Sequence, residues 1–242
     1  MYRRALLKVS GESLGSSSDI LCEEFLRRLA SEIKEVRGMG AELAVLPGGG
    51  NILRGGERVL RGIERVRADF MGMLGTLINS LALLDALEKE GVEGRVFAPL
   101  SLPNMAEVYE IEKARRFLRQ GVAIFAFGTG SPFFTTDTAA ALRAIEIDAE
   151  VLLKATKVGG VYDRDPKKHN DARFIPYLFY DEVLERRLMV MDLTSITLCK
   201  ENSLPIVVFD IKKEGNLTAA IRGQQVGTKI GGSNERRDLG RA

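Results

Sequence analysis

The sequence predicts an α/β protein whose largely parallel sheet is covered by helices on both faces, a three-layer αβα sandwich. Short apolar runs alternate with amphipathic helical segments along the whole chain, which is the pattern of strand–helix–strand units. Neither a sequence repeat nor a linker rich in proline or serine divides the 242 residues. Because a domain contains roughly 100 to 200 residues, we expect a single domain over residues 1–242 that ends in a polar tail at 231–242.

The first quarter of the chain predicts a strand, a helix and a second strand. Residues 5–9 (ALLKV) form a short apolar run, and the small-residue loop GESLGSSSD follows it. Between residues 25 and 36 apolar side chains recur at three- and four-residue spacing, which predicts a helix that Gly38 and Gly40 end. The next strand, at 41–46, runs directly into a proline and three glycines.

The segment from about 69 to 90 is predicted to form a long helix with one apolar side. That side contains Phe70, Met73, Leu74, Leu77, Ile78, Leu81 and Leu84. Gly72 and Gly75 permit another segment to approach the helix closely. Core packing and a subunit interface both account for this pattern.

Strands and helices continue to alternate in the rest of the chain. The expected elements are a strand at 95–100, a helix at 110–121, a strand at 122–127, a helix at 139–147, a strand at 151–156, a helix at 181–189, a strand at 204–210 and a helix at 217–223. In open parallel sheets, ligands bind in the crevice beyond the carboxyl ends of the strands. The loops at those ends are therefore where function is expected.

Composition excludes several classes of protein. Thirty-five Lys and Arg against 33 Asp and Glu give a net charge of +2, so no broad basic field for a nucleic acid is expected. No apolar run approaches the roughly 18 residues that span a bilayer, and Lys8 and Glu12 come too early for a signal peptide. We therefore expect a cytoplasmic protein without a membrane segment.

The chain offers few residues for metal binding or histidine chemistry. Cys22 and Cys199 lie far apart with no partner at metal-ligand spacing, so both are expected to be small buried hydrophobic residues. The only histidine, His169, lies in the polar stretch DRDPKKHND. This disfavours chemistry that depends on a histidine base.

Four strand ends run into unusual loops, at 8–11, 48–51, 128–131 and 154–165. A single glycine loop is often only a tight turn, but four together favour phosphate binding. Glycine lets backbone N–H groups approach phosphate oxygens, and a following helix N-terminus adds positive potential. The chain has no Gly-Lys pair, which excludes a Walker A loop, and neither GGGNILRG nor GTGSPFFT has the G-x-G-x-x-G spacing.

Six strings, in order, resemble those of the bacterial uridylate kinases within the amino acid kinase family, and together they cover nearly the whole chain. They are KVSGES, LPGGGNILRG, RADFMGMLGTLINSLAL, GTGSPFFTTDTAAALRAIEI, LKATKVGGVYDRDP and LMVMDLTSITLCKENSLPIVVFD. The string GTGSPFFTTD is the most diagnostic, because relatives that phosphorylate carboxylates or carbamate lack it. The resemblance implies the amino acid kinase fold, with an acceptor side at about 1–150 and an ATP side at about 151–230.

The reaction implied by the resemblance is transfer of the γ-phosphoryl group of ATP to UMP, giving UDP and ADP in pyrimidine nucleotide synthesis, with Mg²⁺. It also implies a homo-oligomer, in this family typically a hexamer. The residues themselves agree with this reaction on one point. A phosphate monoester has a second pKa of about 6, so at neutral pH the acceptor is already mostly a dianion and needs no base. This suits a chain whose single histidine lies in a polar loop.

By position in the matching strings, the resemblance implies three sets of site residues. The catalytic residues are Lys8, Arg54 and Asp137. The ATP-binding residues are Lys8, Val9, Ser10, Gly11, Gly50, Arg54, Thr156, Tyr162 and Asp165. The UMP-binding residues are Gly49, Asp69, Thr129, Gly130, Ser131, Pro132, Phe133, Phe134, Thr135 and Thr136. No protein ligand for a metal is expected.

Several alternatives stay open at this point. Asp69 opens the predicted long helix and is also explained as its N-cap, and Phe133 and Phe134 as core aromatics. Lys154 and Asp192 lie in matching strings without an assigned role. A related kinase acting on a carboxylate, such as acetylglutamate or aspartate, and a non-catalytic nucleotide-binding protein of the same fold are the alternative functions.

Overall fold

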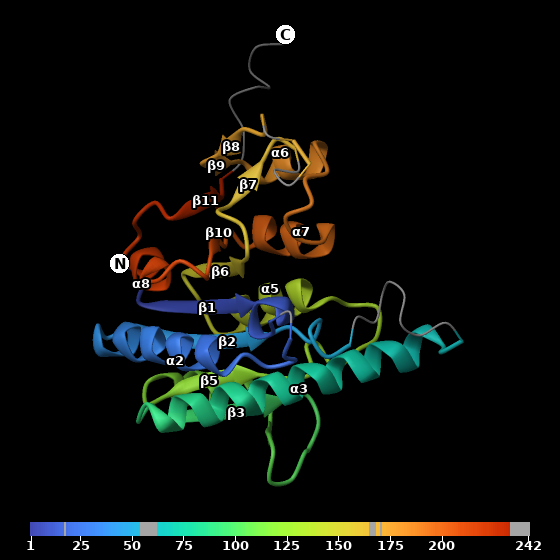
Figure 1. Cartoon of the computed structure of the whole chain (residues 1–242), viewed down its shortest axis with the longest axis vertical. Helices are drawn as coiled ribbons and strands as arrows, with labels where there is room; N and C mark the ends of the chain where they lie inside the picture. Colours follow the sequence, from blue (N-terminus) through green and yellow to red (C-terminus); the bar gives the residue numbers. More distant parts are fainter. Residues whose placement is uncertain (17, 54–61, 165–167, 170, 233–242) are drawn as a thin grey trace.

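The computed structural model describes residues 1–16, 18–53, 62–164, 168–169 and 171–232. Its centre is a nine-stranded sheet in the order β4-β3-β5-β2-β1-β6-β10-β11-β9, with helices on both faces (Figure 1). All neighbouring strands in this sheet are parallel except β10 and β11. The α/β class predicted from the alternating pattern is therefore confirmed.

The elements have the following bounds. The strands are β1 (Arg4–Val9), β2 (Glu42–Pro47), β3 (Gly94–Ala98), β4 (Glu107–Val108), β5 (Val122–Phe125), β6 (Val151–Thr156), β7 (Val161–Tyr162), β8 (Phe174–Ile175), β9 (Tyr177–Leu178), β10 (Ile206–Asp210) and β11 (Gly227–Ile230). The helices are α1 (Gly11–Leu14), α2 (Glu23–Gly38), α3 (Arg65–Lys89), α4 (Ile111–Leu118), α5 (Thr136–Glu146), α6 (Tyr180–Glu185), α7 (Leu193–Glu201) and α8 (Asn216–Ile221). Strands β7 and β8 form a separate antiparallel pair.

Each face of the sheet has its own hydrophobic core, because alternate side chains of a strand point to opposite faces. On β1, Ala5 and Leu7 belong to the core shared with α2, α3 and α8. Leu6, between them, belongs to the core shared with α4, α5, α6 and α7. By the same alternation Lys8 faces the α5 side of the sheet.

Helix α3 begins four residues earlier than expected, since Arg65 is its first residue and Glu64 its N-cap. Asp69 is therefore one turn inside the helix, and the N-cap interpretation of Asp69 is wrong. By length and composition α3 would suffice to cross a membrane, although the sequence predicted no such segment. Half of the most apolar stretch of this helix is nevertheless buried within the fold, where α3 packs on α2, β2, β3 and β5.

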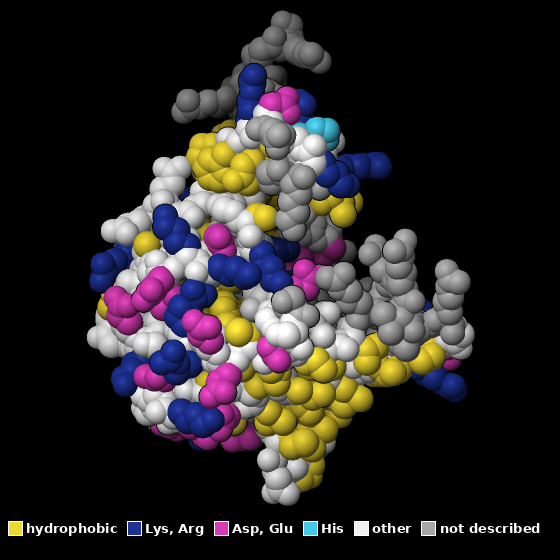
Figure 2. Space-filling view, in the orientation of Figure 1, with side chains coloured by type: hydrophobic (Ala, Val, Ile, Leu, Met, Phe, Trp, Pro, Cys, Tyr) yellow, Lys and Arg dark blue, Asp and Glu magenta, His cyan; other side chains and the backbone are white. Residues whose placement is uncertain are grey.

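The apolar side of α3 is divided between the interior and the surface. Met73 and Leu77 are buried, whereas Phe70, Leu74 and Ile78 are exposed. Figure 2 shows a broad hydrophobic surface along this helix and the neighbouring loop between β3 and β4. Core packing therefore explains only part of the pattern.

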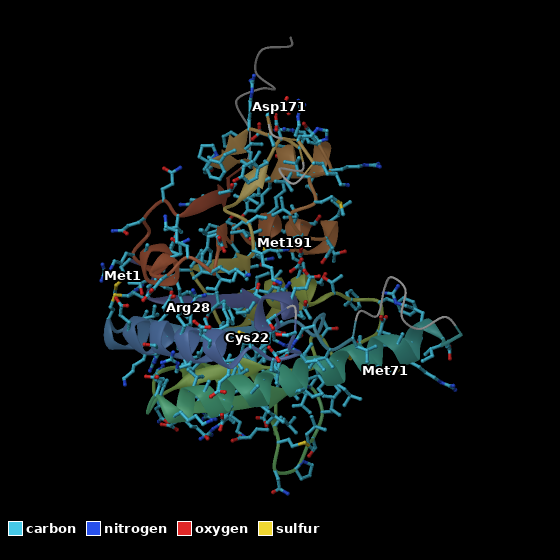
Figure 3. All side chains as sticks on the ribbon, in the orientation of Figure 1. Met1, Cys22, Arg28, Met71, Asp171 and Met191 are labelled. Carbon is cyan, nitrogen blue, oxygen red and sulfur yellow. The ribbon has the colours of Figure 1, made fainter. Side chains whose placement is uncertain are left out.

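Short elements account for most of the differences from the sequence prediction. Helix α7 and strand β11 were not expected. The α7 segment is rich in Ser and Thr, which are weak helix formers, and β11 is defined by its antiparallel pairing with β10. Cys199 is fully buried as expected, while Cys22 is only half-buried at the start of α2 (Figure 3).

Candidate active site

Two lysines lie side by side where β1 and β6 end. The parallel register pairs Lys8 with Lys154, so both side chains point to the α5 face of the sheet. The first turn of α5 places Asp137 between them. Its Oδ1 lies 2.7 Å from Lys8 Nζ and its Oδ2 accepts a hydrogen bond from Lys154 Nζ, also at 2.7 Å. Lys154 Nζ also donates to the carbonyl of Val190.

Burial and charge act against each other in this cluster. Burial alone would raise the pKa of the Asp137 carboxyl, but the ammonium groups of Lys8 and Lys154 outweigh it and lower that pKa to about 2. Burial, together with the positive charge of Lys8, lowers the pKa of Lys154 below its usual value although Asp137 opposes this. The two lysines thus share Asp137 as their direct partner, and the nearby carboxylate of Asp192 also favours the charged form of Lys154.

The 48–51 loop after β2 is held against both the end of β1 and helix α3. A Cβ on Gly11 would lie 2.4 Å from the Gly50 nitrogen, and a Cβ on Gly49 would lie 2.6 Å from the Gly72 carbonyl oxygen. Neither glycine has a positive φ. Close backbone approach, and not a left-handed turn, therefore requires glycine at positions 11 and 49.

The other expected residues of the β1 end have internal partners. Val9 is buried in the α2 side of the core, and the Ser10 hydroxyl lies 2.7 Å from that of Ser13 in the short helix α1. Arg54, expected as an ATP-phosphate and catalytic arginine, lies outside the described residues.

A pocket of about 280 Å³, here called the α3 pocket, lies between α3, the 48–51 loop and residues 127–136. Six of the ten expected UMP-binding residues line it, namely Gly49, Asp69, Thr129, Phe134, Thr135 and Thr136. The other four, Gly130, Ser131, Pro132 and Phe133, belong to the same loop but are not among its lining residues. The segments that contain Gly49, Asp69 and residues 129–136 lie far apart in the sequence and meet at this pocket.

Asp69 ties α3 to the loop that closes this pocket. Its Oδ2 accepts a hydrogen bond of 2.8 Å from the backbone N–H of Phe133, and both oxygens accept from Arg65 Nε. Phe133 has φ of 70°, uncommon for a residue other than glycine, and this bond helps to hold it there. The Arg65 guanidinium lies 5.5 Å from the centroid of the Phe133 ring.

The two phenylalanines of the loop are surface residues. Phe133 is 66% exposed and Phe134 is 53% exposed. The interpretation of both as core aromatics is therefore wrong. Phe134 lines the α3 pocket, so an apolar ring is available to a ligand there.

A second pocket, the β6 pocket, has a volume of about 560 Å³ and lies between the end of β6, β7 and residues 186–190. Thr156 and Tyr162, both expected at the ATP site, line it. The Thr156 hydroxyl donates to the Val158 carbonyl at 2.8 Å, and the Tyr162 ring packs edge-on against Phe174. Asp165 lies outside the described residues.

Asp192 ties the start of α5 to α7 beside the lysine cluster. Its carboxylate caps α7 by accepting from Ser195 N–H at 2.9 Å, and it accepts hydrogen bonds from the hydroxyls of Thr135 and of Thr138, the latter at 2.8 Å. Thr136, which precedes Asp137 in the chain, lines the α3 pocket, and Val190, whose carbonyl accepts from Lys154, lines the β6 pocket. The cluster therefore lies between the two pockets.

Two buried polar residues of α3 were not among those predicted from the sequence. The Thr76 hydroxyl accepts a hydrogen bond of 2.8 Å from Phe127 N–H, at the start of the 127–136 segment. The Asn79 amide donates to the Gly48 carbonyl at 2.6 Å. A polar residue in the middle of an otherwise apolar helix was the signal available for both.

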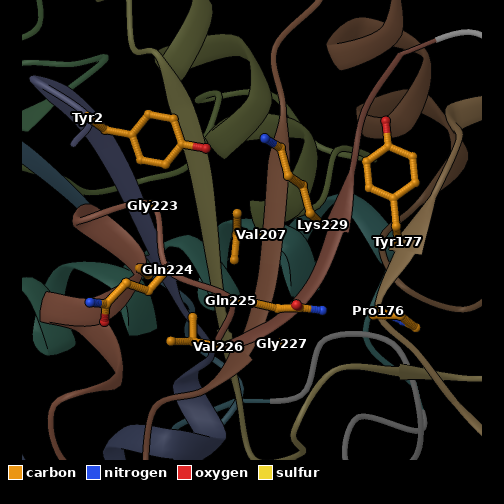
Figure 4. Close-up of a pocket in the computed structure, with 11 residues that line it drawn as sticks. Tyr2, Pro176, Tyr177, Val207, Gly223, Gln224, Gln225, Val226, Gly227 and Lys229 are labelled. Carbon is orange, nitrogen blue, oxygen red and sulfur yellow. The ribbon is translucent and has the colours of Figure 1, made fainter.

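A separate pocket of about 310 Å³ lies beside the end of α8 and strands β9 to β11, where the side chains of Tyr2 and Lys229 approach one another (Figure 4). None of the expected site residues lines it.

The combination of paired lysines, glycine loops and two pockets on this fold can be compared with known proteins. The amino acid kinase family model matches residues 3–210. The chain belongs to the amino acid kinase family. The match extends from β1 to β10 and so includes every element that supplies the lysine cluster and the two pockets.

Solved structures of this family resemble the chain over nearly its full length. UMP kinase from Bacillus anthracis is 35% identical with a TM-score of 0.91, covering 95% of this chain and 96% of that one. UMP kinase from Ureaplasma parvum is 32% identical with a TM-score of 0.89, covering 96% and 100%. Uridylate kinase from Archaeoglobus fulgidus is 27% identical with a TM-score of 0.73, covering 93% and 99%.

Proposed function

We propose that this kinase transfers the γ-phosphoryl group of ATP to UMP, giving UDP and ADP in pyrimidine nucleotide synthesis. The observation that carries the proposal is the α3 pocket, which the GTGSPFFTTD segment builds directly beside the Lys8–Asp137–Lys154 cluster. The similarity of the whole chain to UMP kinases supports it.

The two pockets suit a donor and an acceptor on opposite sides of one centre. All residues that line the α3 pocket precede position 150, and all that line the β6 pocket follow it. We assign UMP to the α3 pocket and the adenosine part of ATP to the β6 pocket, with Tyr162 near the adenine. Their phosphates then meet over the lysine cluster.

The chemistry requires charge neutralisation more than proton transfer. An oxygen of the UMP phosphate forms a bond to the γ-phosphorus, while the bond from that phosphorus to the β,γ-bridging oxygen breaks and ADP leaves with the electron pair. The attacking phosphate is mostly a dianion at neutral pH. We propose that Lys8 neutralises charge on the transferring group and that Asp137 and Lys154 hold it in place.

Magnesium is part of this proposal as the ion that accompanies ATP. Kinases usually hold Mg²⁺ by substrate phosphates and water with one or two carboxylates. The carboxylate of this centre, Asp137, already contacts two ammonium groups, and the described part of the chain holds no group of three His, Cys, Asp or Glu arranged for a metal. The residues therefore do not form a resident metal site, and we assign Mg²⁺ to the nucleotide phosphates.

The same proposal includes a homo-oligomer, by family resemblance a hexamer, in the cytoplasm. The exposed residues Phe70, Leu74 and Ile78 of α3 offer an apolar face for a second copy (Figure 2). Light scattering on the purified protein tests this, and Ile78→Asp should yield a smaller species if this face joins the copies.

A coupled ADP-release assay tests the reaction on UMP, CMP, acetylglutamate and aspartate. We expect turnover with UMP in clear preference to CMP, because a site that hydrogen-bonds the uracil edge leaves polar groups mispaired against cytosine. Comparable efficiency with CMP would refute the uridine preference. Turnover with only a carboxylate would replace the proposed acceptor, and nucleotide binding without turnover would indicate a non-catalytic protein.

A further inference from the structure

We infer that Asn79, a residue that touches neither pocket, is a positioning residue that fixes the 48–51 loop for binding of both nucleotides. This inference rests on the proposed function, because Gly49 of that loop is assigned to UMP and Gly50, which also lines the α3 pocket, to ATP. The Asn79 side chain is fully buried in the middle of α3, a helix whose other buried residues are mostly apolar.

The hydrogen bonds of Asn79 are directed at the loop and not at its own helix. Its Nδ2 donates to the Gly48 carbonyl at 2.6 Å and to Asn51 Oδ1 at 2.7 Å, and its Oδ1 accepts from Asn51 Nδ2 at 3.0 Å. Asn51 Nδ2 also donates to the Ile20 carbonyl at 2.7 Å. The two amides therefore form a reciprocal pair that holds both ends of the loop on α3.

Fixing the Gly48 carbonyl also sets the direction of the next N–H. A trans peptide is planar with its C=O and N–H pointing in opposite directions, so the Gly49 N–H points away from Asn79. None of the described residues accepts a hydrogen bond from the N–H groups of Gly49, Gly50 or Asn51. Successive free N–H groups in such a loop bind anions, and here their direction depends on the amide pair.

The packing leaves the loop little freedom to compensate for the loss of this pair. Gly11 packs against the Gly50 nitrogen and Gly49 against the Gly72 carbonyl, so a shift in either direction meets backbone. Because backbone blocks a shift toward Gly11 and a shift toward α3, we expect the loop to move outward, away from both, when Asn79 is truncated. A misplacement of about 1 Å in such a site can reduce rate by about a hundredfold.

Asn79→Ala, compared with Ser80→Ala, tests the inference. Ser80 is the next residue on α3, is also fully buried, and donates its hydroxyl only to the Thr76 carbonyl of the same helix. Asn79→Ala should raise KM for both UMP and ATP and lower kcat, by about ten- to a hundredfold in kcat/KM. Ser80→Ala, which also loses one buried hydrogen bond, should stay within about twofold of the wild type.

Hydrogen exchange of backbone amides supplies a readout that is independent of turnover. The N–H groups of Gly48, Ile52 and Leu53 have backbone partners in the wild type. Their exchange should become faster in Asn79→Ala and stay unchanged in Ser80→Ala. If Asn79→Ala does not fold, Asn51→Ala removes the same amide pair from the half-buried loop side and takes its place.

The outcomes separate this inference from the proposed function. If the wild type does not phosphorylate UMP, the proposed function fails, and faster exchange confined to residues 48–53 still supports the positioning role. If the wild type is active and Asn79→Ala matches Ser80→Ala in kinetics or in local exchange, Asn79 is only a buried structural residue and the inference is overturned.

Discussion

Lys8 and Lys154 are register partners on neighbouring parallel strands, and one carboxylate, that of Asp137, lies 2.7 Å from both ammonium groups. Two cations side by side in a buried site repel each other, and the carboxylate that the first turn of α5 supplies offsets this repulsion. The arrangement places two lysines and the carboxylates of Asp137 and Asp192 together at the edge of the sheet where the loops after β1 and β6 begin. In the proposed function Lys8 is the cation that faces the transferring phosphoryl group.

Removal of Lys8 should abolish most activity and leave the fold intact. In Lys8→Ala, Asp137 still pairs with Lys154, so the buried carboxylate is not left without a cation. We expect kcat to fall by about a hundredfold or more, the loss seen when one preorganised electrostatic group is removed. The coupled ADP-release assay and a melting curve measure the two quantities.

Lys200→Ala is the matched control for this variant. Lys200 is also paired with an aspartate, Asp181, but it lies on α7 and lines neither pocket. It should keep near wild-type turnover. If Lys8→Ala does the same, Lys8 has no role in the chemistry.

Asp137 makes stability depend on pH in a defined range. Its pKa is about 2 in the folded protein against an ordinary value of 3.8, so its contribution is complete above about pH 4 and is lost as pH falls toward 2. The full contribution is about 2 kcal/mol, of which about 1 kcal/mol should be lost by pH 3.

Urea unfolding of the wild type and of Asp137→Asn at pH 6 and pH 3 measures this effect. Other carboxylates titrate equally in both proteins, so the difference in free energy of unfolding isolates Asp137. That difference should shrink by about 1 kcal/mol at pH 3. Parallel pH profiles would show that the lysines do not stabilise the ionised carboxylate.

The fold could be predicted because its strands and longer helices have strong periodic patterns. The lysine pair could not be predicted from periodicity, since the pairing of Lys8 with Lys154 depends on the register between strands that lie far apart in the sequence. Motif resemblance placed Lys8 and Asp137 together but gave Lys154 no role. Only the register and the position of α5 show that all three meet.

Boundary errors also changed the interpretation of individual residues. Asp69 looked like a helix cap because the charged residues before it hide the first turn of α3, which begins at Arg65. Helix α5 begins at Thr136, earlier than its apolar residues suggest, because the Thr135 hydroxyl accepts hydrogen bonds from the N–H groups of Asp137 and Thr138. Local capping is weakly marked in sequence, so helix ends are predicted less well than helix centres.

Asp69→Asn should weaken UMP binding selectively. The carboxylate holds Phe133 N–H and, in the proposed function, accepts hydrogen bonds from the ribose hydroxyls. Loss of its charge should cost about 1 to 3 kcal/mol of UMP binding, the range for hydrogen bonds to charged groups. We expect a raised KM for UMP with little change for ATP. The melting temperature should stay almost unchanged, because an asparagine amide oxygen can still accept from Phe133 N–H and because Arg65, the cation of the lost ion pair, is 55% exposed.

Asp85→Asn controls for the loss of an aspartate from the same helix. Asp85 pairs with Lys89 four residues on, as Asp69 pairs with Arg65 four residues back, and its Oδ2 lies 2.7 Å from Lys89 Nζ. Asp85 lies at the opposite end of α3 and outside the α3 pocket. It should leave both KM values unchanged. Equal effects of Asp69→Asn on UMP and ATP would remove Asp69 from the acceptor site.

The two central glycines of the 48–51 loop should respond differently to an added methyl group. In Gly49→Ala the new Cβ would lie 2.6 Å from the Gly72 carbonyl oxygen and 3.1 Å from the Thr76 nitrogen, both backbone atoms of a packed helix. The loop must then move, which should destabilise the fold by about 1 to 3 kcal/mol, as overpacking does, and raise KM for UMP. In Gly50→Ala the nearest contact is 4.0 Å, to the flexible Glu12 side chain, so the melting temperature should stay at the wild-type value. Any kinetic change in Gly50→Ala then reports on the approach of ATP phosphates to the loop. An equal loss of stability in both variants would show that contact with α3 does not determine the position of Gly49.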